Sequence, residues 1–477
     1  RGPDDYGIWF DQDSKVGLAF RRLAILDLSS AGHQPMTSQS GRYVVAFNGE
    51  IYNHLELKHE INLQFGPQSW EGRSDTEILL FLIEKYGLHD TLKKCVGMFA
   101  IALWDRESNF LQIARDRFGE KPLYYGWSGS NFLFGSDLSS LKKFPSFQEV
   151  ICPQALSLYL NYSYVPAPLS IYKDFFKVEP GQIITFKSSE GITQTESVNW
   201  FWRLESELSN AKSDMYDSME DGLTGLKAAL QDSINLQMIS DVPIGSFLSG
   251  GIDSSLITAM MQEQSAAPIK TFTIGFQNQN FDESPYAKSV AAFLGTDHTE
   301  VILSEKDALD VIPSIPDIYS EPFADSSQIP TYLVAKIAKS EVTVSLTGDG
   351  GDELFGGYNR YFWSQKIWRK VNWMPFAIRK SIGQLLVKSP ADLANSIELL
   401  INKTSMDGRV TRLNDKVQKL ASRLQFISSE RSLYSSLCTE WNDTHDLITP
   451  AYQSLNSSQL KLAPLEGLSA IENMMYW

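Results

Sequence analysis

The segment 249–255, of sequence S-G-G-I-D-S-S, contains the residue types that proteins use to hold phosphate. It follows the apolar run 242–248 and precedes a helical pattern, which predicts a strand, a glycine turn and a helix N-terminus. Glycines let the backbone approach an anion, and the first helical turn offers N–H groups and a positive dipole end. No lysine is present, so the segment does not match the Walker A pattern. Asp253 would repel a polyphosphate unless a cation lay between them, which indicates Mg²⁺.

A second acidic, glycine-rich cluster, T-G-D-G-G-D-E at 347–353, follows the apolar run 342–346. The carboxyl ends of parallel strands meet at one edge of a sheet, where ligands bind. We therefore expect Asp253 and Asp352 to face one magnesium nucleotide. A simpler interpretation of the first cluster is a helix capped by Asp253 and Ser254. A calcium loop at the second cluster is disfavoured, because its spacing is not met.

These clusters need a sheet to position them, and the rest of the chain predicts one. From residue 223 onward helical and buried-strand patterns alternate, with helices expected up to 238 and over 253–264, 284–294 and 327–340, and strands over 242–248, 270–276 and 342–348. This alternation predicts a parallel α/β sheet with helices on both faces. Residues 1–190 instead show short alternating strands, such as 43–47, 110–114 and 132–135, with a helix over 75–86, and predict a mainly β layered domain. The predicted domains are 1–190 and 221–477, joined by a polar linker over 191–220.

Composition excludes several function classes. The 477 residues suffice for two or three domains, and the net charge of −15 disfavours nucleic-acid binding, which usually shows a basic stripe. The longest apolar runs are strand-sized, so we expect no membrane span. The three cysteines, Cys95, Cys152 and Cys438, have no metal-ligand spacing and fit a reducing cytoplasm. Cys95 lies beside an apolar segment and is expected to be a small buried residue.

The first cluster and seven further motifs, in order along nearly the whole chain, resemble the glutamine-hydrolysing asparagine synthetase family. The seven further motifs are R-G-P-D-D (1–5), R-L-A-I-L-D-L (22–28), F-N-G-E-I-Y-N (47–53), R-S-D-T-E (73–77), A-R-D-R-F-G-E-K-P-L-Y-Y (114–125), E-P-F-A-D-S-S-Q-I-P-T (321–331) and T-G-D-G-G-D-E-L-F-G-G-Y (347–358). The resemblance implies an Ntn-hydrolase-like αββα glutamine amidotransferase domain. A parallel-sheet ATP-pyrophosphatase domain with a helical C-terminal region would follow it.

The resemblance also implies roles for residues of the first domain. Asn48 and Gly49 would form the oxyanion hole for the glutamine amide. Glu50 and Asp75 would hold the substrate α-amino group, and Arg22 would hold its α-carboxylate in a bidentate grip. The glutamine-binding segment would comprise Arg22, Leu23, Ala24, Ile25 and Leu26. Two of these positions have structural alternatives. Asn48-Gly49 is a strong hairpin signal, and Asp75 lies in a capping box that starts at Ser74.

In the second domain the resemblance implies an ATP site formed by Leu248, Ser249, Gly250, Gly251, Asp253, Ser254, Ile274, Thr347 and Gly348. Mg²⁺ would bind Asp253 and Asp352, and Asp349 would be the acid needed to form an aspartyl adenylate. The implied substrates are glutamine, aspartate and ATP, and a homodimer stays open. The acceptor could instead be another carboxylate, such as a sugar uronic acid.

One departure from the family concerns the nucleophile. Such enzymes use an N-terminal cysteine whose own α-amino group serves as base, yet no cysteine precedes Cys95. Since R-G-P-D-D matches an internal stretch of the family, and the chain stops before a family lysine, we expect a fragment of a longer protein. If the chain were mature as it stands, an ATP-binding protein with an inactive glutaminase half would be the alternative.

Overall fold

The computed structural model describes residues 2–189, 192–211, 216–278, 282–387, 421, 423–441, 465 and 467–476. The chain divides into two compact units, 1–156 with 164–349, and 157–163 with 350–477. The first unit holds both an antiparallel and a parallel sheet.

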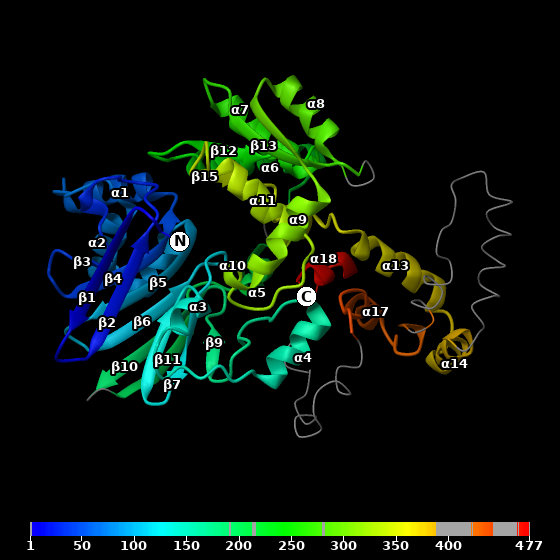
Figure 1. The fold of residues 1–477 in the computed structure, drawn as a ribbon, viewed down its shortest axis with the longest axis horizontal. Coiled ribbons are helices and arrows are strands. Elements are labelled where there is room, and N and C mark those ends of the chain that lie inside the picture. Colours follow the sequence, from blue (N-terminus) through cyan, green and yellow to red (C-terminus); the bar gives the residue numbers. More distant parts are fainter. Residues whose placement is uncertain are drawn as a thin grey trace. The chain divides into compact units, whose positions relative to one another are not determined.

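The N-terminal part is built on a six-stranded antiparallel sheet of order β11-β10-β6-β5-β4-β3. Its strands are β3 (Met36–Thr37), β4 (Tyr43–Ile51), β5 (Gly97–Asp105), β6 (Phe110–Arg115), β10 (Gln182–Ser189) and β11 (Ile192–Trp200). Alternate residues of β4 point to opposite faces, so Val45 and Phe47 pack under two helices while Val44 lies in the other core. The helices are α1 (His54–Phe65) and α2 (Asp75–Lys94), and Figure 1 shows them beside this sheet. β11 extends the sheet into residues that the sequence assigned to the linker.

A second β layer packs on the other face of this sheet. It comprises the hairpin of β1 (Asp5–Asp11) and β2 (Val16–Arg22) and a sheet of β7 (Tyr124–Ser128), β8 (Asn131–Gly135) and β9 (Phe175–Lys177). Leu18, Trp104 and Phe186 are fully buried in the shared core. α3 (Leu138–Leu141) packs against β8, and α4 (Pro153–Tyr162) begins in the first unit and ends in the second. The mainly β layered domain predicted from the sequence is therefore confirmed.

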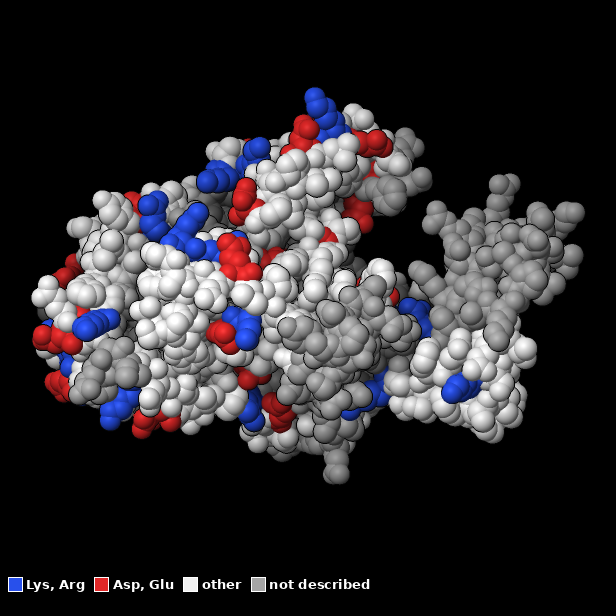
Figure 2. All heavy atoms as spheres, turned by 60° about the horizontal axis from the view of Figure 1, so that its bottom comes forward, with Lys and Arg blue, Asp and Glu red and all other residues white. Residues whose placement is uncertain are grey.

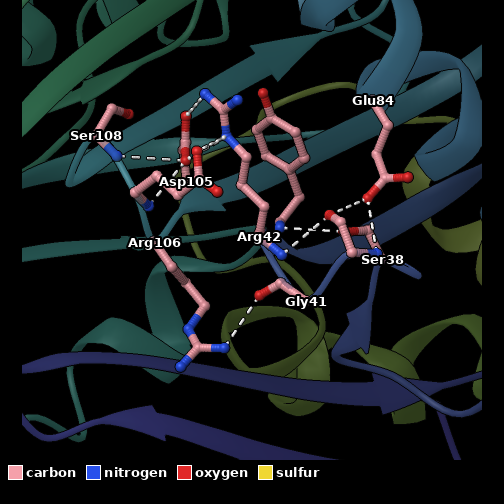
Figure 3. A network of polar contacts seen from close by, with 10 residues as sticks. Ser38, Gly41, Arg42, Glu84, Asp105, Arg106 and Ser108 are labelled. Carbon is pink, nitrogen blue, oxygen red and sulfur yellow. Dashed lines mark hydrogen bonds and ion pairs between the residues drawn. The ribbon is translucent and has the colours of Figure 1, made fainter.

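A polar network holds together the end of the sheet at which β4 begins and β5 ends (Figure 3). Arg42 donates from Nε and Nη2 to the two oxygens of Asp105, at 2.9 and 2.7 Å. Burial would raise the pKa of Asp105, but the hydrogen bond from Arg42 and those from neighbouring N–H groups lower it below its ordinary value. Arg106 donates to Gly41 O at 3.0 Å, and Glu84 accepts from Ser40 N at 3.1 Å. Asn48 and Glu50 lie towards the other end of β4, so this network is separate from the predicted site residues and stabilises the sheet.

The parallel sheet has the order β14-β13-β12-β15. Its strands are β12 (Ile244–Phe247), β13 (Lys270–Phe276), β14 (Asp297–Leu303) and β15 (Val344–Leu346). α6 (Met219–Gln237) and α7 (Ile252–Gln264) pack on one face, through Ile234, Met260 and Met261. α11 (Gln328–Ala338) packs against β13 on another core with Phe272, and α8 (Ser284–Leu294) packs on Leu248. The predicted parallel sheet with helices is confirmed, while β14 was not predicted.

Short helices complete the first unit and helices build the second. The former are α5 (Leu204–Ala211), η1 (Ser30–Gly32), α9 (Glu305–Val311), η2 (Ile312–Ser314) and α10 (Ile315–Ile318). The second unit contains α12 (Gly351–Phe355), α13 (Asn359–Val371), α14 (Phe376–Val387), α17 (Glu430–Leu437) and α18 (Ala470–Tyr476). Its core stacks Tyr361 on Tyr434, with ring centroids 5.8 Å apart, beside Met474.

The surface carries charges of both signs. Figure 2 shows Lys and Arg side chains interspersed with Asp and Glu on the face it presents. Among the residues that the structure describes, no helix is both long enough and apolar enough to span a membrane.

Candidate functional site

Asn48 and Gly49 lie inside strand β4, where they pair with Ala100 and Phe99 of β5. The hairpin interpretation of this dipeptide is therefore wrong. Asn48 donates from Nδ2 to Ser136 Oγ at 3.0 Å, which fixes the direction of its amide. A Cβ at Gly49 would lie 2.1 Å from Met98 O, so the close pairing with β5 explains the glycine at this position. Ser136 was not predicted from the sequence, because only its contact with Asn48 in the folded protein links it to this site.

Glu50 and Asp75 are two buried carboxyls, with 7% and 6% of their surface exposed. Burial, then the charge of Asp75, raises the pKa of Glu50 to about 7, while Lys121 opposes this shift. Burial also raises the pKa of Asp75, although its Oδ2 accepts a hydrogen bond from Ile51 N at 2.8 Å. Ser74 caps α2, accepting from Thr76 N at 3.2 Å. Asp75 is thus both a first-turn residue and a carboxylate held against the end of β4.

In the described part of the chain, neither of these two neighbouring carboxyls forms an ion pair. A cationic ligand would suit them, because a positive group would offset the burial and repulsion that raise their pKa values. Asn48 and Glu50 are two residues apart on β4 and so lie on one face of the strand. The structure therefore brings together an amide and two carboxyls, from β4 and the start of α2.

Arg22, at the end of β2, is buried and bonded to its own loop. Its Nη1 donates to Ser29 O at 3.2 Å, and its Nη2 donates to Leu26 O and Asp27 O at 3.0 and 2.5 Å. A Cβ at Gly32 would lie 1.9 Å from Nη2, so a larger residue there would displace the guanidinium from its present position. The loop 23–29 and Arg22 form one unit, and the role of Arg22 in binding a carboxylate stays a prediction.

Asp116 organises the adjoining loop and was not predicted as a site residue. Its carboxylate accepts hydrogen bonds from the backbone N–H groups of Phe99, Phe118, Glu120 and Lys121 at 2.9 to 3.1 Å. These bonds hold the loop that carries Lys121, the cation that acts on Glu50. Its signal was its place in the motif A-R-D-R-F-G.

Cys95 is fully buried, as expected from its apolar neighbours. Burial raises the pKa of its thiol to about 12. A thiol with this pKa does not supply a thiolate near neutral pH. Cys95 is therefore not a candidate for the nucleophile.

The two glycine clusters meet at the carboxyl edge of the parallel sheet, where β12 and β15 are neighbours. A Cβ at Gly348 would lie 2.7 Å from Ser254 N and 3.0 Å from Asp253 Cβ, so the turn after β15 touches the N-terminus of α7. Gly250 has φ 80°, and its Cβ would lie 2.6 Å from Ala287 N. In both turns the glycine backbone therefore lies closer to a neighbouring helix than a residue with a Cβ could. Such close approach of the backbone is expected at an edge that binds phosphate.

The hydroxyl groups of this edge hold the turns in shape. Ser249 Oγ and Ser254 Oγ are 2.9 Å apart, and Thr347 Oγ1 donates to Asp349 Oδ2 at 2.9 Å. Leu248 continues from β12, where its N–H donates to Phe272 O at 3.0 Å, and Ile274 lies half-buried on β13.

The carboxylate of Asp253 suits a cation. It lies half-buried in the first turn of α7, and within the described part of the chain no hydrogen bond to it is found. Asp352 lies in α12 of the second unit, so its role as the other magnesium ligand stays a prediction. The described residues contain no cluster of three or more His, Cys, Asp or Glu side chains arranged to hold a metal ion.

A cavity of about 560 Å³ lies in the first unit, and its walls include Tyr124, Ser136 and Lys177 of the N-terminal part and Glu321, Thr331 and Tyr332 of the later part. Glu321, the first residue of the motif E-P-F-A-D-S-S, forms an ion pair with Lys177 and accepts from Ile171 N at 2.7 Å. Burial raises the pKa of Glu321 and lowers that of Lys177, and each partner opposes the effect on the other. Ser136 belongs both to this wall and to the hydrogen bond with Asn48.

Comparison with known proteins assigns both halves. A model of the family Asparagine synthase matches residues 225–477, and one of the Glutamine amidotransferase domain matches 1–199. A provisionally named glutamine-hydrolysing asparagine synthetase of Methanocaldococcus jannaschii is 39% identical over 380 residues, covering 75% of this chain and 70% of that protein. Glutamine-hydrolysing asparagine synthetase 1 of Bacillus subtilis is 39% identical over 362 residues, covering 76% and 54%. Amidase chry2 of Gibberella zeae is 31% identical over 380 residues, covering 76% and 54%. The chain thus spans little more than half of the last two proteins.

Proposed function

Since this chain belongs to the asparagine synthase family, we propose that it takes part in the ATP-dependent conversion of L-aspartate to L-asparagine, with ammonia from glutamine. The observation that carries the proposal is the contact of Gly348 with the N-terminus of α7. This contact supports a shared nucleotide site for the turns at 249–254 and 347–348, in a chain that also holds the carboxyl pair of Glu50 and Asp75.

In the first domain Glu50 and Asp75 bind the α-ammonium group of glutamine, and Arg22 its α-carboxylate. Asn48 and the N–H of Gly49 donate to the oxyanion that develops when the amide carbonyl is attacked. The hydrogen bond from Asn48 to Ser136 supports this role, because it holds the amide in one orientation before the substrate binds. The attacking thiolate belongs to the N-terminal cysteine that the family resemblance implies.

In the second domain the turns at 249–254 and 347–348 hold ATP. An oxygen of the aspartate side-chain carboxylate forms a bond to the α-phosphorus, and pyrophosphate leaves. Ammonia then forms the C–N bond and AMP leaves. Mg²⁺, held by Asp253 and Asp352, would offset the negative charge of the phosphates. The unpartnered carboxylate of Asp253 supports this assignment.

The cavity beside Glu321 serves the transfer of ammonia between the two reactions. Ammonia must travel unprotonated, and it loses its reactivity as ammonium once it takes a proton from water. Two observations support the assignment: Ser136 contacts Asn48 at one wall, and Thr331 and Tyr332 of the second domain form another.

Pyrophosphate exchange into ATP tests the proposal on the full-length protein. Exchange should require L-aspartate, because adenylation needs the acceptor carboxylate. Asp253→Ala and Asp352→Ala should each abolish exchange and leave glutamine hydrolysis nearly intact. Asp232→Ala, which removes an exposed carboxylate from α6, is the matched control.

Two results would contradict the assignment. Exchange driven by a uronic acid and not by aspartate would move the acceptor to another carboxylate, and exchange with neither would favour an ATP-binding protein without synthetase activity. Near-normal exchange in Asp253→Ala would remove the magnesium assignment.

The three cysteines are free, which supports a location in the reducing cytoplasm. Thiol titration of the protein in intact cells would test this. Sedimentation of the full-length protein would decide between a monomer and the homodimer left open by the sequence.

A further inference from the structure

The backbone of Asp27 adopts a left-handed conformation, with φ 55°, in the middle of the loop 23–29. Residues other than glycine rarely adopt it, so surrounding contacts must hold it. Arg22 Nη2 donates to its carbonyl oxygen. The carboxylate of Asp27 accepts hydrogen bonds from Ser29 N at 3.0 Å and from Arg73 N at 2.7 Å. The conformation of Asp27 thus determines where the carbonyl groups that hold Arg22 lie.

The backbone N–H of Asp27 donates a hydrogen bond to a residue of the synthetase domain. Asp241 Oδ2 accepts from Asp27 N at 2.8 Å, and Asp241 N donates to Ile25 O at 3.0 Å. The two bonds clamp the loop from both sides of Leu26. Both partners belong to the same compact unit of the chain.

Asp241 is itself held in a short, anchored connection between α6 and β12. Ser240 Oγ accepts from Val242 N at 3.1 Å, and Pro243 O accepts from Thr343 N, next to β15, at 3.0 Å. The strand that follows ends at the nucleotide turns. Asp241 therefore presents its carboxylate from a rigid part of the synthetase domain.

We propose that Asp241 is a positioning residue for the glutaminase reaction: the synthetase domain holds the loop 25–27, and with it Arg22, in the shape that binds glutamine. This inference rests on the proposed function of the first domain. It predicts that glutamine affinity depends on a carboxylate outside the glutaminase domain, which makes no contact with glutamine.

Asp241→Ala and Asp241→Asn in the full-length protein test the proposal, with Asp232→Ala as a matched control. Asp241→Ala loses the hydrogen bond from Asp27 N and an ion pair at 3.9 Å with the exposed Arg73, of which the hydrogen bond is the stronger. This loss should raise KM for glutamine about tenfold and leave kcat of hydrolysis nearly unchanged. Ammonia-dependent synthesis should also stay unchanged. Asp241→Asn keeps an oxygen acceptor and should restore most of the affinity.

Hydrogen exchange separates this inference from the proposed function, because it needs no activity. Amides of a peptide covering 23–29 should exchange faster in Asp241→Ala than in Asp232→Ala. Unchanged exchange, or an unchanged KM, would overturn the inference. A parallel loss of ammonia-dependent synthesis would also overturn it, since Asp241 would then be structural for the second domain. Faster exchange in a protein that hydrolyses no glutamine would support the loop clamp and refute the proposed glutaminase.

Discussion

The Glu50 carboxyl is buried, and burial destabilises its ionised form. Its pKa rises from 4.5 to about 7, first because it is buried and then because of Asp75. Below pH 4.5 the folded and unfolded states both hold the proton. Between these two values the folded state binds more protons, so stability falls as pH rises, and the full penalty applies above about pH 7.

Glu50→Gln should therefore stabilise the protein at pH 8 by up to about 2 to 3 kcal/mol, and by little at pH 4.5 or below. It should also raise KM for glutamine, because an amide does not attract the α-ammonium group. Urea unfolding at several pH values measures the first effect. Glu56→Gln, on the exposed surface of α1, is the control, and an equal gain there would show that Glu50 carries no special penalty.

Asn48→Ala should slow glutamine hydrolysis by roughly 10² to 10³, the usual loss for one oxyanion donor. Ser136→Ala keeps the amide but removes its hydrogen-bond partner, so its loss should be smaller. Ammonia-dependent synthesis should persist in both variants. If it fell together with hydrolysis in Asn48→Ala, the residue would be structural in β4.

At the scale of elements, Gly348 is the point where the turn after β15 touches α7. Gly348→Ala places a methyl group 2.7 Å from Ser254 N, where only backbone could give way. Displacing either turn should reduce aspartate-dependent pyrophosphate exchange by on the order of 10² and leave glutamine hydrolysis intact. Gly222→Ala in α6 is the matched control, since its methyl group would meet only Tyr216 at an ordinary 3.8 Å. Similar exchange rates in the two variants would argue against contact between the turns.

The sequence predicted the elements around the nucleotide site well, because glycines mark their ends and the apolar periods are strong. α8 was predicted over the same residues as observed, and the end predicted for α2 falls beside its kink at Gly87, where φ is 76°. β14 was missed because its first four residues are polar and it gains its place only by pairing with β13. Asn48-Gly49 resembles a turn, but β4 passes through it because β5 pairs along its whole length.

Much of the candidate site could not be predicted from spacing. Asp75 bonds to Ile51, 24 residues earlier, because the first turn of α2 meets the end of β4. Ser136 reaches Asn48, and Asp241 reaches Asp27, across even longer separations. A sequence motif identifies both residues of such a contact only when each of them lies in a motif. Ser136 and Asp241 lie in none.

At the scale of the whole molecule, the contacts found among the described residues between the glutaminase and synthetase halves of the first unit include two groups. One is the clamp of Asp241 on the loop 25–27, and the other is the ion pair of Lys177 with Glu321 beside the cavity. Under the proposed function, the first would bear on how glutamine binds and the second on where ammonia goes. Separate variants should therefore affect glutamine affinity and ammonia transfer independently.

Thr331 and Ala335 lie one turn apart on α11, and both line the cavity. Replacing both by Phe should fill part of its volume of about 560 Å³, so that ammonia escapes to solvent before it reaches the adenylate. Asparagine formed per glutamine hydrolysed should fall by on the order of tenfold, as expected when a productive path loses about 1.4 kcal/mol to a competing one. Hydrolysis itself and ammonia-dependent synthesis should stay near normal.

Lys336→Phe adds the same ring at a neighbouring position of α11 that does not line the cavity, and should leave the ratio unchanged. The two products, asparagine and glutamate, are measured in the same reaction, so the ratio does not depend on protein concentration. If the double variant lost ammonia-dependent synthesis as well, the cavity would belong to the aspartate site and not to a passage. A normal ratio in the double variant would place the route of ammonia elsewhere, because two added rings along one wall must narrow any path that runs between Ser136 and Tyr332.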